Sequence, residues 1–387
     1  MTCCGFSFMK ILLLSAYDAE SHRRWRHGLV ANLDHHHWTV LHLPARHFNW
    51  RVRGNSLSWG RGEQECLSQP FDLIVATSMV DLSTLKGLVP ALATTPTILY
   101  FHENQFSYPL TAHQKYVMEP RMVSLYSGLA ANKIVFNSDY NRLTFLDGVA
   151  ELLKKMPDAV PAGIVEELKT KSRVISVPLE QELFQKTPLI KPNTLTIVWN
   201  HRWEYDKGPD KLLGVLQALP EDVSITCHIV GQQFRRVPDT FDVIHNLLKS
   251  RGWLGAWGFV ADPAAYRTLL AQSHVVLSTA LHDFQGLSVL DGVAAGCIPL
   301  VPDRLAYTEL FDSAYRYYSD FSHHNPDTHV ASMAESKDCA QRIMAWALAV
   351  SAGEPLPPVM ALSTMQWQSL SAEYEKVFND TVGAVVL

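Results

Sequence analysis

The sequence predicts an α/β protein built from two doubly wound, Rossmann-like domains that face each other across a cleft. Short β-branched or leucine-rich runs alternate with longer helical patterns, which is typical of parallel sheets covered on both faces. This alternation stops and restarts once along the chain, so two sheets are expected. The 387 residues, 47% of them hydrophobic and 18% charged, are enough to bury two cores.

The elements of the two series can be predicted from these patterns. Strands are expected in the first series at 10–16, 38–43, 72–76, 97–101, 133–137 and 173–177, and in the second at 194–200, 224–230, 274–278 and 298–301. Helices are expected at 22–33, 118–131, 210–218, 239–249, 262–271, 287–295 and 335–348, with a last one at about 365–378. A polar, proline-containing stretch lies between the series, so the domains are predicted to span 9–187 and 188–387. The last helix could pack back on the N-terminal domain.

Composition excludes several classes of protein. The 33 basic and 38 acidic side chains leave a formal net charge of −5, so the chain is no broadly basic nucleic-acid coat, although a local basic surface stays possible. No apolar run reaches the roughly 18 residues that a membrane-spanning helix needs. The six cysteines have no metal-site spacing and are expected to be free thiols in a reducing cytoplasm. We therefore expect a cytoplasmic protein with no membrane partner and no metal site.

Loops that follow strands carry the first candidate site, because ligands of parallel sheets bind at the carboxyl ends of strands. Arg202 and Lys207 lie between the first strand of the second series and a helix. Two cations there can hold a diphosphate and stabilise its growing charge when a sugar departs. The alternative is a solvated surface pair with Glu204 and Asp206.

A second loop of this half places acids beside a helix start. Asp283 precedes the predicted helix, and Asp291 lies in its first two turns, so the two carboxylates can hold hydroxyls on either side of a diphosphate. The backbone N–H groups of Gly286, Leu287 and Ser288 are expected to point at the anion. The alternatives are a helix-capping role for Asp283 and an ordinary polar helix position for Asp291.

The N-terminal half carries two further candidate segments. Ser21 and His22 follow the first predicted strand. A predicted loop between Arg46 and Arg61 contains four arginines and no acid, with two interleaved tryptophans, and so suits phosphate contacts and base stacking. Its candidate contacts are Arg46, Trp50 and Arg51. The alternative is a loop with its arginines in water.

A dense polar cluster follows the fourth predicted strand. It consists of His102, Glu103, Asn104 and Gln105. His102 can hydrogen-bond a sugar or orient an acceptor hydroxyl, while a buried histidine with satisfied hydrogen bonds is the alternative.

The donor segments resemble the nucleotide-diphosphosugar site of retaining family 4 glycosyltransferases, which have the GT-B fold. The matching residues are Arg202, Lys207-Gly208 and the run from Asp283 to Asp291, where aspartate stands at both positions that are usually glutamate. The resemblance implies that Arg202 and Lys207 bind the diphosphate, Asp283 the transferred sugar and Asp291 the ribose. It implies neither a metal nor any cofactor besides the sugar-nucleotide co-substrate.

Longer strings resemble the tRNA-queuosine α-mannosyltransferase family in particular. They are Tyr-Phe-His-Glu-Asn-Gln at 100–105, Val-Phe-Asn-Ser at 135–138 and His-Arg-Trp-Glu at 201–204, within a similarity that runs from Lys10 to about Leu310. The resemblance implies GDP-mannose as donor and the cyclopentenediol of queuosine in a tRNA anticodon as acceptor. It also implies an N-terminal acceptor-binding domain and a C-terminal nucleotide-sugar-binding domain.

In this interpretation His102 and Asp283 are the catalytic candidates. Arg202, Lys207, Gly286, Leu287, Ser288 and Asp291 bind the donor, and Ser21, His22, Arg46, Trp50, Arg51, Glu103, Asn104 and Gln105 bind the acceptor. Two alternatives stay open. One is a GT-B enzyme with another nucleotide sugar and a lipid, glycan or metabolite acceptor, and the other is a protein that binds a nucleotide sugar or tRNA without catalysis.

Overall fold

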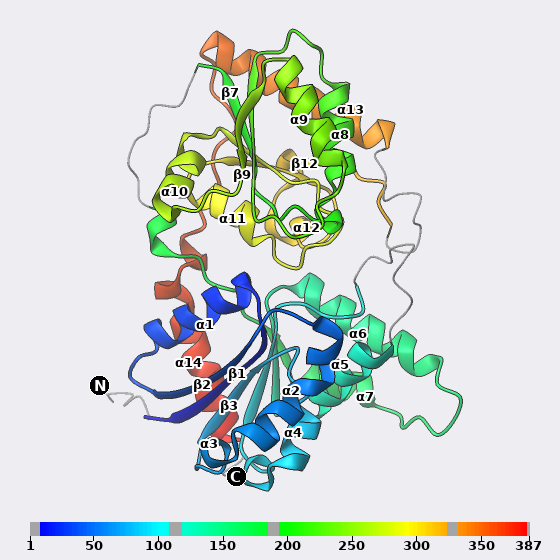
Figure 1. The fold of residues 1–387 in the computed structure, drawn as a ribbon, viewed down its shortest axis with the longest axis vertical. Coiled ribbons are helices and arrows are strands. Elements are labelled where there is room, and N and C mark those ends of the chain that lie inside the picture. The colour runs from blue at the N-terminus through cyan, green and yellow to red at the C-terminus, as the bar shows by residue number, and fades with distance from the viewer. Residues whose placement is uncertain (1–7, 108–117, 185–192, 323–331, 385–387) are drawn as a thin grey trace. The chain divides into compact units, whose positions relative to one another are not determined.

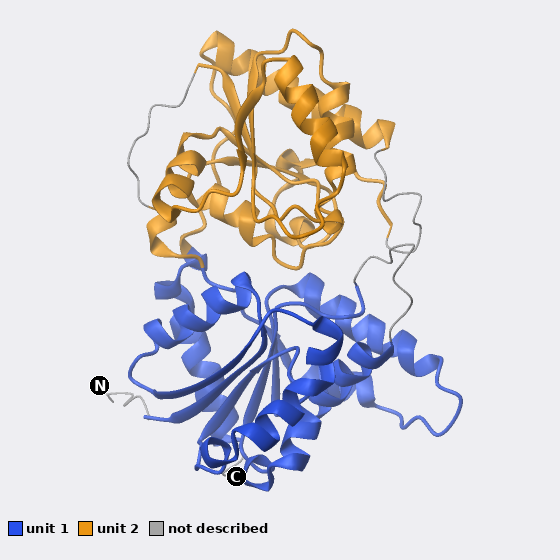
Figure 2. Ribbon diagram, in the orientation of Figure 1, with its two compact units in different colours: residues 1–108, 114–178, 364–387 blue, residues 109–113, 179–363 orange. Residues whose placement is uncertain are grey.

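The computed structural model describes residues 8–107, 118–184, 193–322 and 332–384. The chain divides into two compact units (Figure 2). Unit 1 contains the described residues before Leu179 together with those from Thr364 onward, and unit 2 is Leu179–Ser363. The predicted boundary at residue 187 lies outside the described residues, and the contacts divide the chain after Pro178 instead.

Unit 1 is a six-stranded, wholly parallel sheet with helices on both faces (Figure 1). Its strand order is β2-β1-β3-β4-β5-β6. The elements are β1 (Lys10–Asp18), α1 (Glu20–Asn32), β2 (His37–Pro44), α2 (Phe48–Gly62), α3 (Gln64–Leu67), β3 (Leu73–Thr77), α4 (Leu82–Leu88), η1 (Pro90–Leu92), β4 (Thr97–Phe101), α5 (Met118–Ala130), β5 (Lys133–Phe136), α6 (Asp139–Lys154), α7 (Ile164–Thr170), β6 (Ser172–Val174) and α14 (Trp367–Gly383).

Unit 2 repeats this architecture with the order β12-β11-β10-β7-β8-β9, again all parallel. Its elements are η2 (Gln181–Phe184), β7 (Leu195–Trp199), η3 (Tyr205–Lys207), α8 (Pro209–Ala218), β8 (Ile225–Val230), α9 (Thr240–Ser250), β9 (Leu254–Gly258), α10 (Pro263–Gln272), β10 (Val275–Leu277), α11 (Leu287–Ala294), β11 (Ile298–Pro302), α12 (Tyr307–Leu310), η4 (Ser313–Tyr315), β12 (Arg316–Tyr317) and α13 (Met333–Ala352).

Strand order locates the binding edge in each unit. In unit 1 the chain runs from β1 outward to β2 and then returns to the other side of β1 as β3. In unit 2 it runs from β7 to β9 and then returns to the other side of β7 as β10. Such reversals open a crevice at the carboxyl ends of the two central strands. Ligand sites are therefore expected after β1 and β3 in unit 1, and after β7 and β10 in unit 2.

The structure adds elements that the sequence patterns did not predict, among them α2, α6, β9 and β12. The predicted basic loop after Arg46 is wrong from Phe48 onward, since that segment is the helix α2. Its glycines and tryptophans are poor helix formers, but Val52 and Trp59 on its inner face are buried in the core of unit 1. Tertiary burial thus overrides local propensity, and Trp59 is a core residue that cannot stack on a base.

The last helix belongs to unit 1. The hydroxyl of Tyr374 on α14 lies 3.0 Å from the indole nitrogen of Trp25 and 3.2 Å from the hydroxyl of Tyr100. The Trp367 ring lies against Gly28 of α1, where a Cβ atom would come within 2.3 Å of it. A glycine on α1 therefore makes room for the docking of α14.

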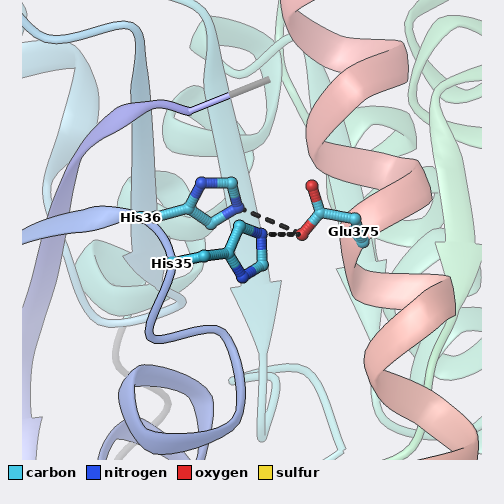
Figure 3. Close-up of side chains that lie close together, drawn as sticks. All are labelled: His35, His36 and Glu375. Carbon is cyan, nitrogen blue, oxygen red and sulfur yellow. Dashed lines mark hydrogen bonds and ion pairs between the residues drawn. The ribbon is translucent and has the colours of Figure 1, made fainter. Parts of the chain in front are cut away.

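A second anchor of α14 is the group His35, His36 and Glu375 (Figure 3). Both imidazole rings point at one carboxylate oxygen of Glu375, from 3.2 and 3.0 Å. The backbone N–H of Met9 donates to Nδ1 of His36, so the proton of the neutral ring lies on Nε2 and is donated to Glu375. Both nitrogens of His36 are thereby used in hydrogen bonds. We interpret this group as a set of hydrogen bonds and ion pairs that connects the β1–β2 region to α14. Its three ligand atoms also lie close enough together to hold a metal ion.

No helix among the described residues has the length and the apolar character to cross a membrane.

Candidate active site

The loop after β7 brings Lys207 to the end of β10 in unit 2. Gly208 has φ = +66°, and a Cβ atom on it would lie 2.2 Å from the carbonyl oxygen of Thr279. Only glycine combines that backbone conformation with so close an approach. Gly208 is therefore a structural requirement of the loop that positions Lys207.

The ammonium of Lys207 is held among three oxygens. It donates to the backbone carbonyl of His282 at 2.7 Å and lies 3.2 Å from Asp206 and 3.8 Å from Asp283. Its side chain is only 10% exposed. Lys207 is thus a fixed, largely desolvated cation, whose interactions are stronger than they would be in water.

Arg202 differs from Lys207 in exposure. Its side chain is 45% exposed, and it pairs with Glu204 at 2.9 Å and with Asp206 at 3.6 Å. In this structure Arg202 therefore makes the ion pairs with Glu204 and Asp206 that were the alternative to diphosphate binding. An exposed guanidinium with such partners can exchange them for a phosphate at little cost, because exposed ion pairs are weak.

Asp283 is an oriented, ionised carboxylate. One oxygen accepts from the backbone N–H of Gly286 at 3.1 Å, and the other accepts from the hydroxyl of Tyr307 at 3.0 Å. Burial alone would raise the pKa of Asp283, but Lys207, His201 and the Tyr307 hydroxyl together lower it below its usual value. A carboxylate held in this way can accept from a sugar hydroxyl and stabilise positive charge.

The expectation for the start of α11 needs one correction. The N–H of Gly286 donates to the carboxylate of Asp283, so in this structure it is not free to bind a diphosphate. Gly286 is required for its φ of +72° and because a Cβ atom would lie 2.7 Å from the Tyr307 ring. The N–H groups of Leu287 and Ser288 have no acceptor among the described residues and stay available at this helix start. Asp291 lies further along α11 and is buried.

Sequence reasoning missed three residues of this site: His201, Asp206 and Tyr307. Asp206 accepts the backbone N–H groups of Leu281 and His282 through its carbonyl, at 2.9 and 3.1 Å, and so joins the two loops. Its place between Arg202 and Lys207 was a usable signal. Tyr307 offered none, because it reaches Asp283 from a separate helix.

In unit 1 the structure brings His22 and His102 together. Their ring centroids are 4.3 Å apart. Nδ1 of His22 lies 2.7 Å from the carbonyl oxygen of Tyr17, which can only accept, so Nδ1 carries a proton and donates it there. Trp25 and Tyr100 enclose the ring of His102 at 4.8 and 4.7 Å. Burial, and next the neighbouring His22, hold the pKa of His102 well below its usual value.

His102 is a buried histidine, but its hydrogen-bonding groups are not all satisfied, so the structural alternative for this residue holds only in part. Nε2 of His102 is buried and has no hydrogen-bond partner among the described residues. Ser21 lies in the first turn of α1 and is partly exposed, next to His22. Ser21 and His22 follow β1, where strand order predicts binding, and His102 follows β4, one strand beyond β3 at the same edge of the sheet.

Of the other residues in the polar cluster after β4, one has a structural role and two are accessible to a ligand. Asn104 is fully buried, and its amide nitrogen contacts oxygens of Asn141 and Thr144 at 2.9 to 3.1 Å. Its oxygen accepts from the backbone N–H of Phe106. Asn104 therefore anchors this loop to α6, and its predicted role in acceptor binding is corrected. Glu103 and Gln105 are partly exposed beside it.

The three candidates from the basic segment also divide. Arg46 is exposed just before α2, and Trp50 is 53% exposed on its first turn. The Trp50 ring lies against Gly54, where a Cβ atom would come within 2.4 Å. Arg51 is buried on the inner side of α2 and is removed from the expected contact surface. Trp50 on its glycine is a rigid, accessible aromatic surface.

Comparison with solved structures defines the class of protein. HepE of Anabaena, in complex with UDP and glucose, matches with a TM-score of 0.64 at 15% identity, over 96% of this chain and 100% of HepE. The trehalose-6-phosphate synthase OtsA matches with a TM-score of 0.61 at 13% identity, over 97% of this chain and 99% of OtsA. With its two parallel six-stranded sheets, this chain has the GT-B fold of glycosyltransferases, as predicted.

Sequence comparison then identifies the family. Residues 10–179 match the family model described as tRNA-queuosine alpha-mannosyltransferase N-terminal. The tRNA-queuosine alpha-mannosyltransferase of Drosophila melanogaster is 31% identical over 317 residues, which cover 79% of this chain and 83% of the fly protein. The chain belongs to the tRNA-queuosine alpha-mannosyltransferase family, and the resemblance stated from its motifs is confirmed.

Proposed function

We propose that this protein transfers mannose from GDP-mannose to the cyclopentenediol of queuosine in a tRNA anticodon. Membership of the tRNA-queuosine alpha-mannosyltransferase family supports the acceptor and the sugar. The observation that supports catalysis is the arrangement in unit 2, where the buried Lys207, the ionised Asp283 and the start of α11 converge at the ends of β7 and β10.

The reaction breaks the bond between C1 of the sugar and the diphosphate, and forms a bond from C1 to an acceptor oxygen. Negative charge grows on the leaving diphosphate, where Lys207, Arg202 and the N–H groups of Leu287 and Ser288 stabilise it. Positive charge grows on the sugar ring, for which Asp283 supplies a fixed negative charge. The acceptor hydroxyl attacks C1 from the face from which the diphosphate leaves, and the leaving phosphate takes the hydroxyl proton. The configuration at C1 is therefore retained without a protein nucleophile.

The side chains at the binding edge of unit 1 suit the acceptor. Nε2 of His22 can form a hydrogen bond with a hydroxyl, and His102 offers a second ring nitrogen nearby. Arg46 and Trp50 provide an exposed cation and an exposed ring for the RNA. We expect activity in the cytoplasm without a metal or further cofactor, because the cations of unit 2 take the charge that a metal would otherwise neutralise.

The test is mass spectrometry of queuosine-containing tRNA after incubation with the protein and GDP-mannose. The expected result is one added hexose on the queuosine nucleoside, which is unaffected by EDTA and lost with Lys207→Ala. The same tRNA lacking queuosine is the matched control. Unchanged queuosine beside slow release of GDP would reject the acceptor, and no binding of GDP-mannose would reject the donor.

A further inference from the structure

The loop after β7 contains a buried ring nitrogen without a partner. His201 is 2% exposed, and its Nε2 has no hydrogen-bond partner among the described residues. Nearly all buried polar groups in native proteins are hydrogen-bonded, and an unsatisfied one destabilises the fold. A nitrogen kept in this condition at the binding edge of unit 2 indicates a ligand.

The orientation of this ring is fixed from several sides. Its Nδ1 lies 2.9 Å from the hydroxyl oxygen of Ser288. The ring packs edge-on against Trp199, with centroids 5.0 Å apart. Behind it, the carbonyl of His201 is so close to Gly231 that a Cβ atom there would approach within 1.8 Å. The contact with Gly231 fixes the backbone of His201, while Trp199 and Ser288 orient its ring, and Ser288 connects the ring to the first turn of α11.

The charges around the ring belong to the proposed donor site. Burial, which outweighs the neighbouring Asp283, lowers the pKa of His201 to about 4, with Lys207 and Arg202 also lowering it and Asp206 opposing them. The ring is thus neutral at pH 7 and carries one proton. When the Ser288 hydroxyl donates to Nδ1, that proton lies on Nε2.

The neighbouring Asn200 also has a buried side-chain atom without a hydrogen-bond partner among the described residues. Its amide nitrogen donates to the carbonyl of Ser288 at 2.7 Å, so the unpartnered atom is the oxygen, an acceptor. An ionised diphosphate oxygen only accepts hydrogen bonds. Of these two residues, His201 is therefore the one that can bind such an oxygen.

We propose that His201 donates a hydrogen bond from Nε2 to a diphosphate oxygen of the nucleotide-sugar donor, with the hydroxyl of Ser288 holding the ring in the required tautomer. This inference rests on the proposed function, because it assigns a further residue to the same donor site. His201 adds a neutral donor beside the cation of Lys207 and the N–H groups of α11. Its unpartnered state without ligand is the cost of a site formed in advance.

The experiment compares His201→Phe, His201→Gln and Ser288→Ala with the wild type, by calorimetric titration with GDP-mannose and by thermal unfolding without ligand. His201→Phe keeps a ring and removes the nitrogen, so GDP-mannose should bind about tenfold more weakly or worse. Its melting temperature should stay equal or rise, because an unsatisfied polar atom is gone. His201→Gln, whose amide can donate, should restore most of the affinity, and Ser288→Ala should fall between the two.

His274→Gln is the matched control, since His274 is also buried in unit 2 and accepts the backbone N–H of Thr196 through Nδ1. It should lower the melting temperature without a selective effect on affinity. Equal binding by wild type and His201→Phe would overturn the inference alone. A lower melting temperature of His201→Phe with no rescue by His201→Gln would also overturn it, in favour of a packing role. Failure of the wild type to bind GDP-mannose would overturn the proposed donor itself.

Discussion

The two units use one architecture to build two different binding edges. In unit 2 the edge after β7 and β10 is charged, with Lys207 between Asp206 and Asp283. In unit 1 the edge after β1 and β4 is formed by rings, with His22 against His102. Both edges lie at the carboxyl ends of parallel strands and include the first strand of the sheet, beside which the strand order reverses.

The difference shows which features come from the fold and which from side chains. The fold decides where a ligand binds, because in both units the chain returns to the other side of the first strand and leaves polar loops at the carboxyl ends of the strands. Side chains decide what is bound. A fixed cation with a helix start suits an anion that gains charge during reaction, while imidazole nitrogens suit hydroxyl groups, with which they form hydrogen bonds.

The loops at the charged edge of unit 2 are held in place by further buried charged side chains. Arg304 donates to the carbonyl oxygens of Ala280 and Thr279 at 2.9 and 3.1 Å and so holds the loop after β10. Glu335 binds both Arg304 and Lys211, at 2.6 and 2.8 Å, and is 2% exposed. Burial alone would lower the pKa of Lys211, and Glu335 opposes this, although the net shift is downward.

The largest effect is expected from Glu335→Ala. It leaves two buried cations without their shared carboxylate, and breaking a buried ion pair from one side costs about 3–5 kcal/mol of unfolding free energy. Denaturant unfolding measures this cost. Glu221→Ala in the same unit is the control, since Glu221 is 86% exposed and should matter by less than about 1 kcal/mol. Similar losses for both variants would contradict the idea of a supported charged edge.

The next effect is expected from Lys207→Ala. Removal of one fixed electrostatic contact to the leaving group should lower turnover of GDP-mannose by about 10²–10³-fold. Steady-state kinetics on queuosine-containing tRNA measures it. The exposed Lys249→Ala should have wild-type kinetics. A loss confined to KM would show that Lys207 only binds the donor and does not stabilise the departing charge.

A smaller effect is expected in unit 1 from Trp50→Ala. If the exposed ring stacks on a base, its removal should weaken tRNA binding by about 1–3 kcal/mol, tenfold or more, with GDP-mannose binding unchanged. Filter binding at fixed salt measures the affinity. Leu57→Ala is matched to it, since Leu57 is 50% exposed on the same helix. Equal losses for the two variants would argue for a general effect of α2 instead of stacking.

Much of the fold could be predicted from the sequence, because buried parallel strands are short apolar runs. The strand at Thr97–Phe101 has its predicted bounds. The strand β9 was missed because it contains glycines, and Gly255 is needed since a Cβ atom there would lie 2.4 Å from the ring of His228. That requirement depends on a neighbouring strand and leaves no local pattern.

The candidate site shows the same limit. Lys207 and Asp283 could be found because they follow strands, and position along the chain is enough for that inference. The structural role of Asn104 could not be predicted from the sequence, since its partner Asn141 lies on another element. Tyr307 was equally hidden, because its contact with Asp283 exists only in three dimensions.

The smallest effect concerns acid, and it tests whether the ring-lined edge stays neutral. His102 is neutral in the folded protein because its pKa lies well below the usual value, as a consequence first of burial and then of His22. The unfolded chain takes up a proton near pH 6.5, so the unfolded state binds more protons below that pH. The contribution of His102 is therefore fully present above pH 6.5 and is lost as the pH falls from 6.5 toward the folded pKa.

On going from pH 7.5 to 5.5, His102 should lower the free energy of unfolding of the wild type by about 1 kcal/mol. The variant His102→Phe should lack this part of the decrease. Denaturant unfolding at both pH values measures the difference. Asp283→Asn is the control from the charged edge. Because the pKa of Asp283 is lowered, its contribution is present above the unfolded value of 3.8 and is lost only below it, so this variant should keep the wild-type difference between pH 7.5 and 5.5. If His102→Phe loses as much stability in acid as the wild type, His102 is charged in the folded protein and the edge of unit 1 is not neutral.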